Sequence, residues 1–472
     1  MRRRRVPTTL AVAALVVASL TACSDNTRTT APANPSFATA RSDRDATTPP
    51  ITAQMVRELA ASRGIGPLPG APRVRPQLVK LGQALAFDKV LSGNRDISCM
   101  TCHLPAYGTS DGRSVSIGQG GIGLGPQRTH PSGALIPRNA PPLFNLNAMM
   151  HLFWDGRVSV DANGNFHTPA GAQLTPEMTR VFEFGALSAL PMFPVSSAAE
   201  MRGDQGSNEL ANIRDDDFTG IWAGIMRRLG EIPAYRRMFE NAYPGTRFED
   251  MTFAHASNAI AGFIVDQYTF ANSPWDQFLA GRDRALTQSQ LEGAQAFLTL
   301  KCSTCHTGAM LSDDQFHDVA MAQIGPGEGN GVSGRDDFGR MNVTNNSADR
   351  YRFRTTPLRN VELTAPYGHD GAISSLRAFI EHYSESDKKL MAFDPQQLEP
   401  SLRGTLLDNV SDVLAQRDTL LNGVVLTDDL VDKLMEYMSA LTDDAARDLS
   451  KSIPKHVPSG LSIDTPIGGG HR

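Results

Sequence analysis

Apolar residues recur at helical spacing along most of the chain. Leu78, Leu81 and Leu85 fall on one helix face, and a similar pattern begins at Met55–Leu59. Segments that alternate between apolar and polar residues, as half-buried strands do, are few. The 41 glycines and 30 prolines are frequent between the helical stretches, which indicates long loops wrapped around something large. The pattern therefore predicts a mainly α fold with long loops.

Another helical stretch covers residues 252–270 and stops near Pro274. Because 472 residues are enough for two or three domains, we place a domain boundary soon after this stretch, near Gly281. The predicted organisation is a first domain over residues 55–280 and a second over 281–472. We expect the last helix to pack back on the first domain.

One unit of sequence occurs twice and joins a helix to a cysteine pair. In the first copy, Leu81–Phe87 (LGQALAF) leads to Cys99–His103 (CMTCH). In the second copy, Leu291–Phe297 (LEGAQAF) leads to Cys302–His306 (CSTCH). The stretch 287–290 (TQSQ) has the pattern of a capping box and predicts a helix start just before the second copy. The repeat predicts two related units.

The CxxCH spacing carries specific chemistry. Two cysteines three residues apart can each add to one vinyl group of a haem, and the adjacent histidine can reach the iron as an axial ligand. Zinc is the rival, because cysteine and histidine also bind it, but structural zinc sites favour paired ligand knuckles. Two covalently bound c-type haems are therefore predicted, one in each domain. Their ligands are Cys99, Cys102 and His103, and Cys302, Cys305 and His306.

The charge balance and the cysteine count exclude several classes of protein. A net charge of −5 supplies no field for nonspecific nucleic-acid binding, so nucleic acid is not expected as a partner. Four of the five cysteines lie in the two short clusters and the fifth lies near the N-terminus, which excludes a disulfide scaffold.

The N-terminus has the pattern of an export signal. Arg2–Arg5 precede the apolar run Leu10–Leu20, which is too short to span a bilayer. The sequence then resembles a lipobox ending at Cys23, which predicts a signal peptide over 1–22, acylation of Cys23 and a flexible tether over 23–54. An ordinary secreted protein cut nearby is the alternative. We expect a periplasmic, membrane-anchored lipoprotein whose mature net charge is −9, from 41 basic and 50 acidic residues.

The run Gly118–Gly123 matches the GxGxxG pattern of dinucleotide-binding proteins. No strand pattern precedes it and no helix pattern follows it within a βαβ unit. We interpret it as a loop whose glycines let the backbone pass close to a haem edge.

With these motifs, the chain resembles the bacterial di-haem cytochrome c peroxidase family, which includes the tryptophylquinone-maturing enzyme MauG. Four further motifs carry the resemblance: Arg138–Pro141 (RNAP), Phe153–Arg157 (FWDGR), Thr356–Val361 (TPLRNV) and Thr364–Gly371 (TAPYGHDG). The resemblance covers most of the mature chain. It implies two cytochrome-c-like domains, with peroxide reacting at the first haem and the second haem sharing the oxidising equivalents.

The resemblance also assigns roles to single residues. His103 and His306 become proximal iron ligands, and Trp154 matches a tryptophan that lies between the haems; its alternative is a buried core tryptophan. Asn139, Thr364 and Pro366 match positions that hold a calcium ion, a cation that prefers oxygen ligands.

Glu200 matches the distal glutamate of the peroxide pocket, where a carboxylate can move a proton during cleavage of the O–O bond. Many relatives carry a histidine sixteen residues after the first haem histidine, which caps the iron at rest. This chain has Gln119 there. An amide is a poor iron ligand, so an open, permanently reactive first haem is predicted, with His130 as the rival cap.

The second haem of standard peroxidases takes a methionine fourteen residues after the histidine that matches His369. This chain has Tyr383 there, on the apolar face of a predicted helix that begins at Leu376. A phenolate favours oxidised iron, whereas a thioether raises the reduction potential. Iron ligation by Tyr383 is the preferred prediction, and a core tyrosine with another ligand such as Met391 is the alternative.

The predicted function is that of an exported di-haem peroxidase that reduces hydrogen peroxide with electrons from a small c-type cytochrome or cupredoxin. MauG-like oxidation of a side chain of a partner protein is one alternative, and a membrane-tethered electron-transfer cytochrome is another. Fold-level resemblance does not decide between these substrates. The oligomeric state is left open, with a homodimer as one candidate.

Overall fold

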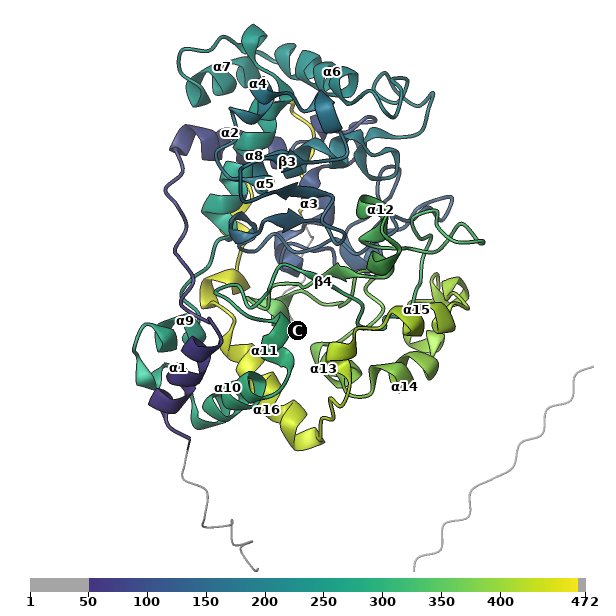
Figure 1. Ribbon diagram of the computed structural model, residues 1–472. Coiled ribbons are helices and arrows are strands. Elements are labelled where there is room, and N and C mark those ends of the chain that lie inside the picture. Colours follow the sequence, from purple (N-terminus) through teal and green to yellow (C-terminus); the bar gives the residue numbers. More distant parts are fainter. Residues whose placement is uncertain (1–50, 466–472) are drawn as a thin grey trace, which may run out of the picture. The chain divides into compact units, whose positions relative to one another are not determined.

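The computed structural model describes residues 51–465, which form one compact unit (Figure 1). The predicted signal peptide, Cys23 and the tether up to residue 50 lie outside the described residues. The first helix begins at Ala53, two residues before the predicted start of the folded body, because the side chain of Thr52 caps it by accepting a hydrogen bond from the Met55 N–H.

The predicted mainly α architecture is confirmed, and the helices are joined by long loops. The longer helices are α1 (Ala53–Ser62), α2 (Pro76–Phe87), α6 (Phe218–Gly230), α7 (Pro233–Ala242), α8 (Phe253–Tyr268), α9 (Pro274–Leu279), α10 (Gln288–Thr299), α13 (Leu376–Tyr383), α14 (Ser386–Met391), α15 (Val410–Gln416) and α16 (Asp428–Ala440). Single-turn helices are α3 (Cys99–Cys102), α4 (Pro176–Thr179), α5 (Ala186–Ala189), α11 (Cys302–Cys305) and α12 (Met341–Thr344).

The strands are short and antiparallel. Strands β1 (His151–Leu152), β2 (Val158–Val160) and β3 (Phe166–His167) form one sheet in that order, and β4 (Phe316–His317) pairs with β5 (Phe353–Arg354). Ser159 pairs with both His151 and His167, and Phe316 pairs with Arg354.

The sequence repeat is also a structural repeat. Helix α2 packs on α8, and α10 packs on α16. A Cβ atom at Gly82 would lie 1.8 Å from the Ala259 carbonyl oxygen, and a Cβ at Gly293 would lie 1.9 Å from that of Lys433. Glycine at the same place in both copies therefore lets each motif-bearing helix approach the backbone of its partner.

The helix starts follow from local sequence. The predicted capping box at Thr287 is present: Gln290 N–H donates to the Thr287 hydroxyl (3.2 Å), and Thr287 N–H donates to the Gln290 side chain (3.0 Å). Thr252 forms a capping box at the start of α8 with His255.

The buried apolar residues form two large clusters that divide close to residue 270. The first cluster contains the buried faces of α2 and α8, and the second contains those of α10, α13 and α16. Helix α1 belongs to the second cluster through Val56 and Ala60, although the predicted boundaries assigned it to the first domain. Conversely, Ala446, Leu449 and Val457, which follow α16, pack into the first cluster.

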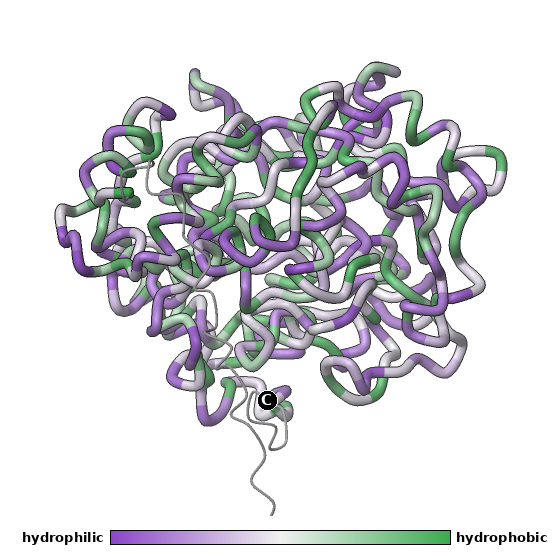
Figure 2. Tube along the Cα trace, turned by 90° about the horizontal axis from the view of Figure 1, so that it is seen from below, coloured by the Kyte–Doolittle hydropathy of each residue, from purple (hydrophilic) through white to green (hydrophobic). Residues whose placement is uncertain are grey.

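In Figure 2, hydrophobic stretches are short and are interrupted by hydrophilic residues. Among residues 51–465, no helix combines the length and the hydropathy needed to cross a bilayer.

Candidate functional site

The two CxxCH motifs fold into matching single-turn helices, each followed by its histidine. Nδ1 of His103 lies 2.9 Å from the Thr109 carbonyl oxygen, and Nδ1 of His306 lies 3.0 Å from that of Leu311. Because a carbonyl only accepts, each Nδ1 carries the proton and each Nε2 keeps a lone pair for a metal. Burial lowers the pKa of both histidines, which favours the neutral, ligating form.

A largely apolar cavity adjoins the second motif. Its wall includes Cys302, Cys305, His306, Trp154 and Tyr383, together with apolar residues of α10, α13 and α16. The two thiols and the histidine therefore face a shared space between helices, which is the donor set that a covalently attached porphyrin requires.

Two polar groups in this cavity wall also fit a porphyrin, which carries two carboxylates. Arg354 is 5% exposed, and no carboxylate of the described residues lies within ion-pairing distance of its guanidinium; burial lowers its pKa. Nδ1 of the buried His369 has no hydrogen-bond partner, and burial lowers the His369 pKa to about 4. A buried cation without a counter-ion and an unpartnered imidazole nitrogen both suit an anionic group in the cavity.

Tyr383 ends α13 and lies in the wall of the same cavity, as its helical spacing predicted. Burial raises its pKa, and the nearby Cys305 and Cys302 thiols raise it further. The alternative residue, Met391, is 60% exposed and lines a different pocket. Two methionines that the sequence analysis did not consider, Met321 and Met438, do line the cavity.

Glu200 lies near the first motif, within electrostatic range of both Cys99 and Cys102. It sits in a single π-helical turn, Ala198–Arg202, an irregularity that is frequent at functional sites. Burial raises its pKa; Arg157 opposes the shift. This carboxyl group therefore holds its proton to a higher pH than an exposed glutamate.

Gln119 and Glu200 are brought together by the Gly118–Gly123 loop. The Gln119 N–H donates to the Glu200 carbonyl oxygen (3.0 Å), and the buried Gln119 Oε1 has no partner. A Cβ at Gly118 would lie 1.9 Å from the Ala199 carbonyl oxygen, so this glycine permits close contact with the Glu200 segment. The predicted loop is present, and close backbone packing explains its first glycine.

One ring nitrogen of His130, the rival iron cap, is already engaged in a hydrogen bond. Its Nδ1 lies 2.8 Å from the Ser132 hydroxyl, and its ring packs against Gly120.

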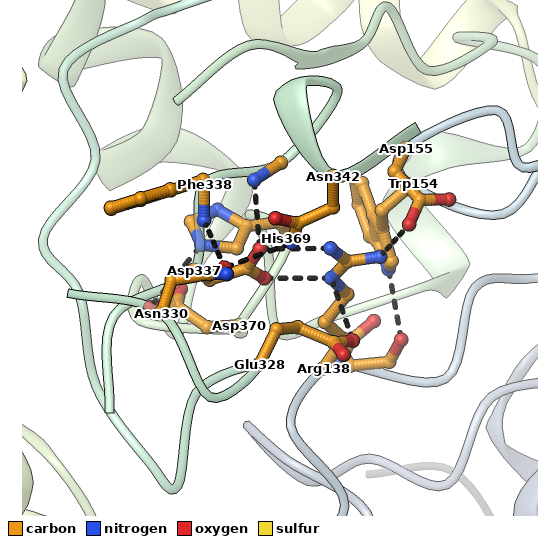
Figure 3. Close-up of polar contacts among 12 residues, drawn as sticks. Arg138, Trp154, Asp155, Glu328, Asn330, Asp337, Phe338, Asn342, His369 and Asp370 are labelled. Carbon is orange, nitrogen blue, oxygen red and sulfur yellow. Dashed lines mark hydrogen bonds and ion pairs between the residues drawn. The ribbon is translucent and has the colours of Figure 1, made fainter. Parts of the chain in front are cut away.

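Trp154 lies beside a buried ion-pair network (Figure 3). Its Nε1–H donates to the Asn139 carbonyl oxygen (2.9 Å). The guanidinium of Arg138 pairs with Asp155 at 2.6 Å and holds both carboxylate oxygens of Asp337 at 2.7 and 2.8 Å. Arg138 precedes Asn139 and Asp155 follows Trp154, so their ion pair joins the two segments. This pairing and the Trp154–Asn139 hydrogen bond hold the indole in the cavity wall.

The three predicted calcium ligands lie in that wall as well. Asn139, Thr364 and Pro366 all line the cavity, although Asn139 is more than two hundred positions from the other two in sequence. The Asn139 amide donates to the Arg113 carbonyl oxygen (2.8 Å), and the Thr364 hydroxyl donates to that of Val361 (2.9 Å). Calcium binding itself stays a prediction.

A cluster that includes Cys305 of the second motif has the residue types of a cation site. Ligand atoms of Cys305, Asp313 and His317 lie within 4.8 Å of one another. Hydrogen bonds to Asp313 and Cys305 raise the pKa of His317 to about 11. Because the Cys305 sulfur would be consumed by a thioether bond, metal binding here and haem attachment exclude each other.

The sequence analysis missed Arg354, His369 as a cavity group, and Arg138 as the centre of a network. Arg138 and His369 belong to the quoted family motifs, so the sequence singled out both positions but assigned neither residue a role. Arg354 gave no signal, because its significance depends on the absence of a nearby carboxylate.

Comparison with known proteins places this geometry in a family. Residues 76–284 match the family model described as di-haem cytochrome c peroxidase. The chain is 29% identical over 342 residues to methylamine utilization protein MauG of Methylorubrum extorquens, covering 71% of this chain and 77% of that protein. It is 32% identical over 319 residues to cytochrome c peroxidase Ccp of Escherichia coli, covering 67% and 55%.

Among solved structures, a MauG-like protein associated with microbial copper homeostasis superposes with a TM-score of 0.58 at 25% identity, covering 82% of this chain and 96% of that one. The di-haem peroxidase BthA from Burkholderia thailandensis superposes with a TM-score of 0.54 at 18% identity, covering 84% and 91%, a likeness of fold alone.

The family model and the relatives support a peroxidase-type oxidoreductase. The chain belongs to the di-haem cytochrome c peroxidase and MauG family.

Proposed function

We propose that the chain carries two covalent c-type haems, one at each CxxCH motif, and reduces hydrogen peroxide. The observation that carries this proposal is the matched histidine geometry, in which His103 and His306 each donate Nδ1–H to a backbone carbonyl, so that the lone pair of each ring lies on Nε2. The haems would supply iron that reacts with peroxide and exchanges electrons. The protein residues supply attachment, orientation and proton transfer.

At the first site, Glu200 is the proton-transfer group. A carboxylate in electrostatic range of both thiols of the motif is placed to take a proton from peroxide and return it to the departing oxygen. Gln119, which replaces a capping histidine, leaves the first site open at rest. Trp154, which donates to the Asn139 carbonyl oxygen and lies in the wall of the second cavity, is the proposed link to the first site.

At the second site, His306 and Tyr383, which line one cavity, are the residues that would hold the iron. A phenolate stabilises oxidised iron, so this site would store an oxidising equivalent. A calcium ion held by Asn139, Thr364 and Pro366 would join the two halves of the chain.

The proposed electron donor is a small c-type cytochrome or cupredoxin, and the mature net charge of −9 suits a basic partner. Tyr383 favours a second candidate function, MauG-like oxidation of a side chain of a partner protein. A membrane-tethered electron-transfer role without peroxide turnover requires both irons to be capped, and Gln119 argues against it. The N-terminal pattern supports a periplasmic lipoprotein anchored through Cys23, and a homodimer remains the candidate assembly.

Stopped-flow mixing of the oxidised protein with peroxide tests this proposal. We expect a rapid spectral change at the first haem without prior reduction. No change would favour the electron-transfer alternative. Steady-state turnover with reduced cytochrome c then separates the two peroxide-dependent functions, because a rapid reaction supports the peroxidase and a negligible one supports modification of a protein.

A further inference from the structure

We propose that Trp275 and Tyr437 form an electron relay that serves the second site. The relay rests on the proposed function, because it needs an oxidised haem at His306. It adds a second oxidisable route, through residues other than Trp154.

The relay is a continuous series of ring contacts. The His306 ring lies 6.4 Å from the Phe297 ring, and the Phe297 ring lies 5.0 Å from the Tyr437 ring. The Tyr437 ring lies 5.0 Å from the Trp275 ring, which stacks on Phe278 at 5.4 Å. Figure 1 shows the helices that carry these rings, α9, α10 and α16, gathered beside α11. Each step is short enough for electron transfer between neighbouring rings.

The ring contacts alone would be expected in any aromatic core. Two buried polar atoms, the Trp275 Nε1 and the Tyr437 hydroxyl oxygen, would not be expected there without hydrogen-bond partners. Trp275 and Tyr437 are fully buried, and neither the indole N–H nor the phenol O–H has a hydrogen-bond partner. Buried tryptophan and tyrosine normally find one. Leaving such a group unpaired is destabilising, and phenylalanine would pack there without that cost.

The other buried indoles and phenols in the part of the chain that the structure describes are satisfied. Trp154 and Trp222 donate to the carbonyl oxygens of Asn139 and Met192. Tyr235, Tyr268 and Tyr351 donate to side-chain oxygens. The two unpartnered groups are therefore in contact with each other and lie on the path to His306. An unsatisfied buried polar group can mark a redox residue, and this placement supports that explanation.

The electron balance is simple. Hydrogen peroxide takes up two electrons and two protons and leaves as two molecules of water, so the haems together would lack two electrons. One electron from the Trp275 indole would return to the haem held by His306, and the second oxidising equivalent would stay on the haems. The Nε1 proton stays on the indole, because no acceptor lies within reach, so the product is an indole radical cation. An external reductant later returns the electron.

Two neighbouring features favour Trp275 as the residue that holds the charge. Burial raises the pKa of Tyr437, so its phenol keeps the proton and the ring serves as a bridge. Beyond Trp275 the next ring is Phe278, a phenyl ring that is harder to oxidise than an indole.

Trp275→Phe in the full-length holoprotein tests the relay, with Trp222→Phe as the matched control, since Trp222 is also buried but lies in the first cluster. One equivalent of hydrogen peroxide is added without donor, and the organic radical is measured by rapid-freeze electron paramagnetic resonance. We expect at least a threefold loss of radical yield in Trp275→Phe and no loss in the control. Tyr437→Phe should slow appearance of the radical.

A second measurement needs no variant. After repeated peroxide additions without donor, peptide mapping of the unaltered protein should show more oxygenation at Trp275 than at Trp222. Equal oxygenation, or equal radical yields in the two variants, would overturn the relay while leaving peroxide turnover intact. If peroxide produces no spectral change in the unaltered protein, the proposed function fails instead.

Discussion

Single residues decide what the two candidate haem sites do. Partial burial raises the pKa of both Glu200 and Tyr383, and the roles proposed for the two residues differ. A carboxyl group with a raised pKa keeps its proton to a higher pH and can pass it on, whereas a phenol with a raised pKa gives up its proton only to a strong partner such as ferric iron.

The first prediction concerns Glu200. As the proton acceptor it must be ionised, and because its pKa lies above the usual value, the peroxide reaction should accelerate as the pH rises through that raised pKa. Glu200→Gln should slow the reaction about 10²–10⁴-fold and remove this pH dependence. Stopped-flow rates measured across pH check both effects. If the rate of Glu200→Gln still rises with pH as the parent's rate does, a group other than Glu200 causes the pH dependence.

The second prediction concerns Tyr383. Replacing it with methionine exchanges an anionic oxygen ligand for a thioether, so Tyr383→Met should raise the reduction potential of the second haem and increase turnover with reduced cytochrome c. Spectroelectrochemical titration measures the potential, and Met391→Leu is the control because Met391 is exposed elsewhere. An unchanged potential in Tyr383→Met would mean that Tyr383 is not a ligand.

At the scale of secondary-structure elements, the repeat is the main organising feature. Helices α2 and α10 each present a glycine to the backbone of a partner helix and each lead into a CxxCH turn. The close crossings hold the motif-bearing helices at a fixed distance from α8 and α16.

The third prediction follows from these crossings. Gly82→Ala and Gly293→Ala should each lower the free energy of unfolding by about 1–3 kcal/mol, because the added methyl group overlaps a backbone carbonyl that cannot move aside easily. Urea unfolding of the holoprotein measures the change. Gly70→Ala is the control, since nothing lies within 4 Å of its Cβ position. Equal stability of all three variants would contradict the tight packing.

Local signals predicted these elements well. The capping pattern at Thr287 and the helical spacing before Tyr383 depend on neighbouring residues, and both were confirmed. The partner of each helix was harder to predict. An amphipathic face shows that α1 is buried against something, but it does not say that the partner is the second cluster.

Contacts between distant segments explain the rest of what the sequence left out. The closeness of Gln119 and Glu200 depends on a loop that packs on the π-helical turn. The significance of the buried Arg354 depends on the absence of a carboxylate within ion-pairing distance among the described residues. Neither property is encoded in residue spacing. The quoted family motifs located the cavity wall through resemblance, and the structure then showed which of their side chains touch.

For the whole molecule, a buried ion-pair network joins the two halves of the sequence. Arg138 contacts Asp155 from the first half and Asp337 from the second, beside Trp154 (Figure 3). Burial opposes ionisation of Asp155, but Arg138 and Arg157 hold its pKa at about 2.

The fourth prediction tests this network. Arg138→Leu should lower the free energy of unfolding by about 3–5 kcal/mol, because two buried carboxylates lose their partner. Arg180→Leu removes an exposed ion pair and should cost no more than about 1 kcal/mol. The ionised Asp155 stabilises the folded parent protein fully above its unfolded-state pKa of about 3.9. This stabilisation is lost as the pH falls through its folded-state pKa of about 2. Urea titrations at neutral and acidic pH measure both, and similar losses in the two variants would contradict the network's role.

The most direct test of the central claim is the haem content of the purified protein. A pyridine haemochrome assay against protein concentration, after denaturation and removal of unbound porphyrin, should give two covalently bound haems per chain. Fewer than two, or a colourless protein, would contradict the account at both CxxCH motifs.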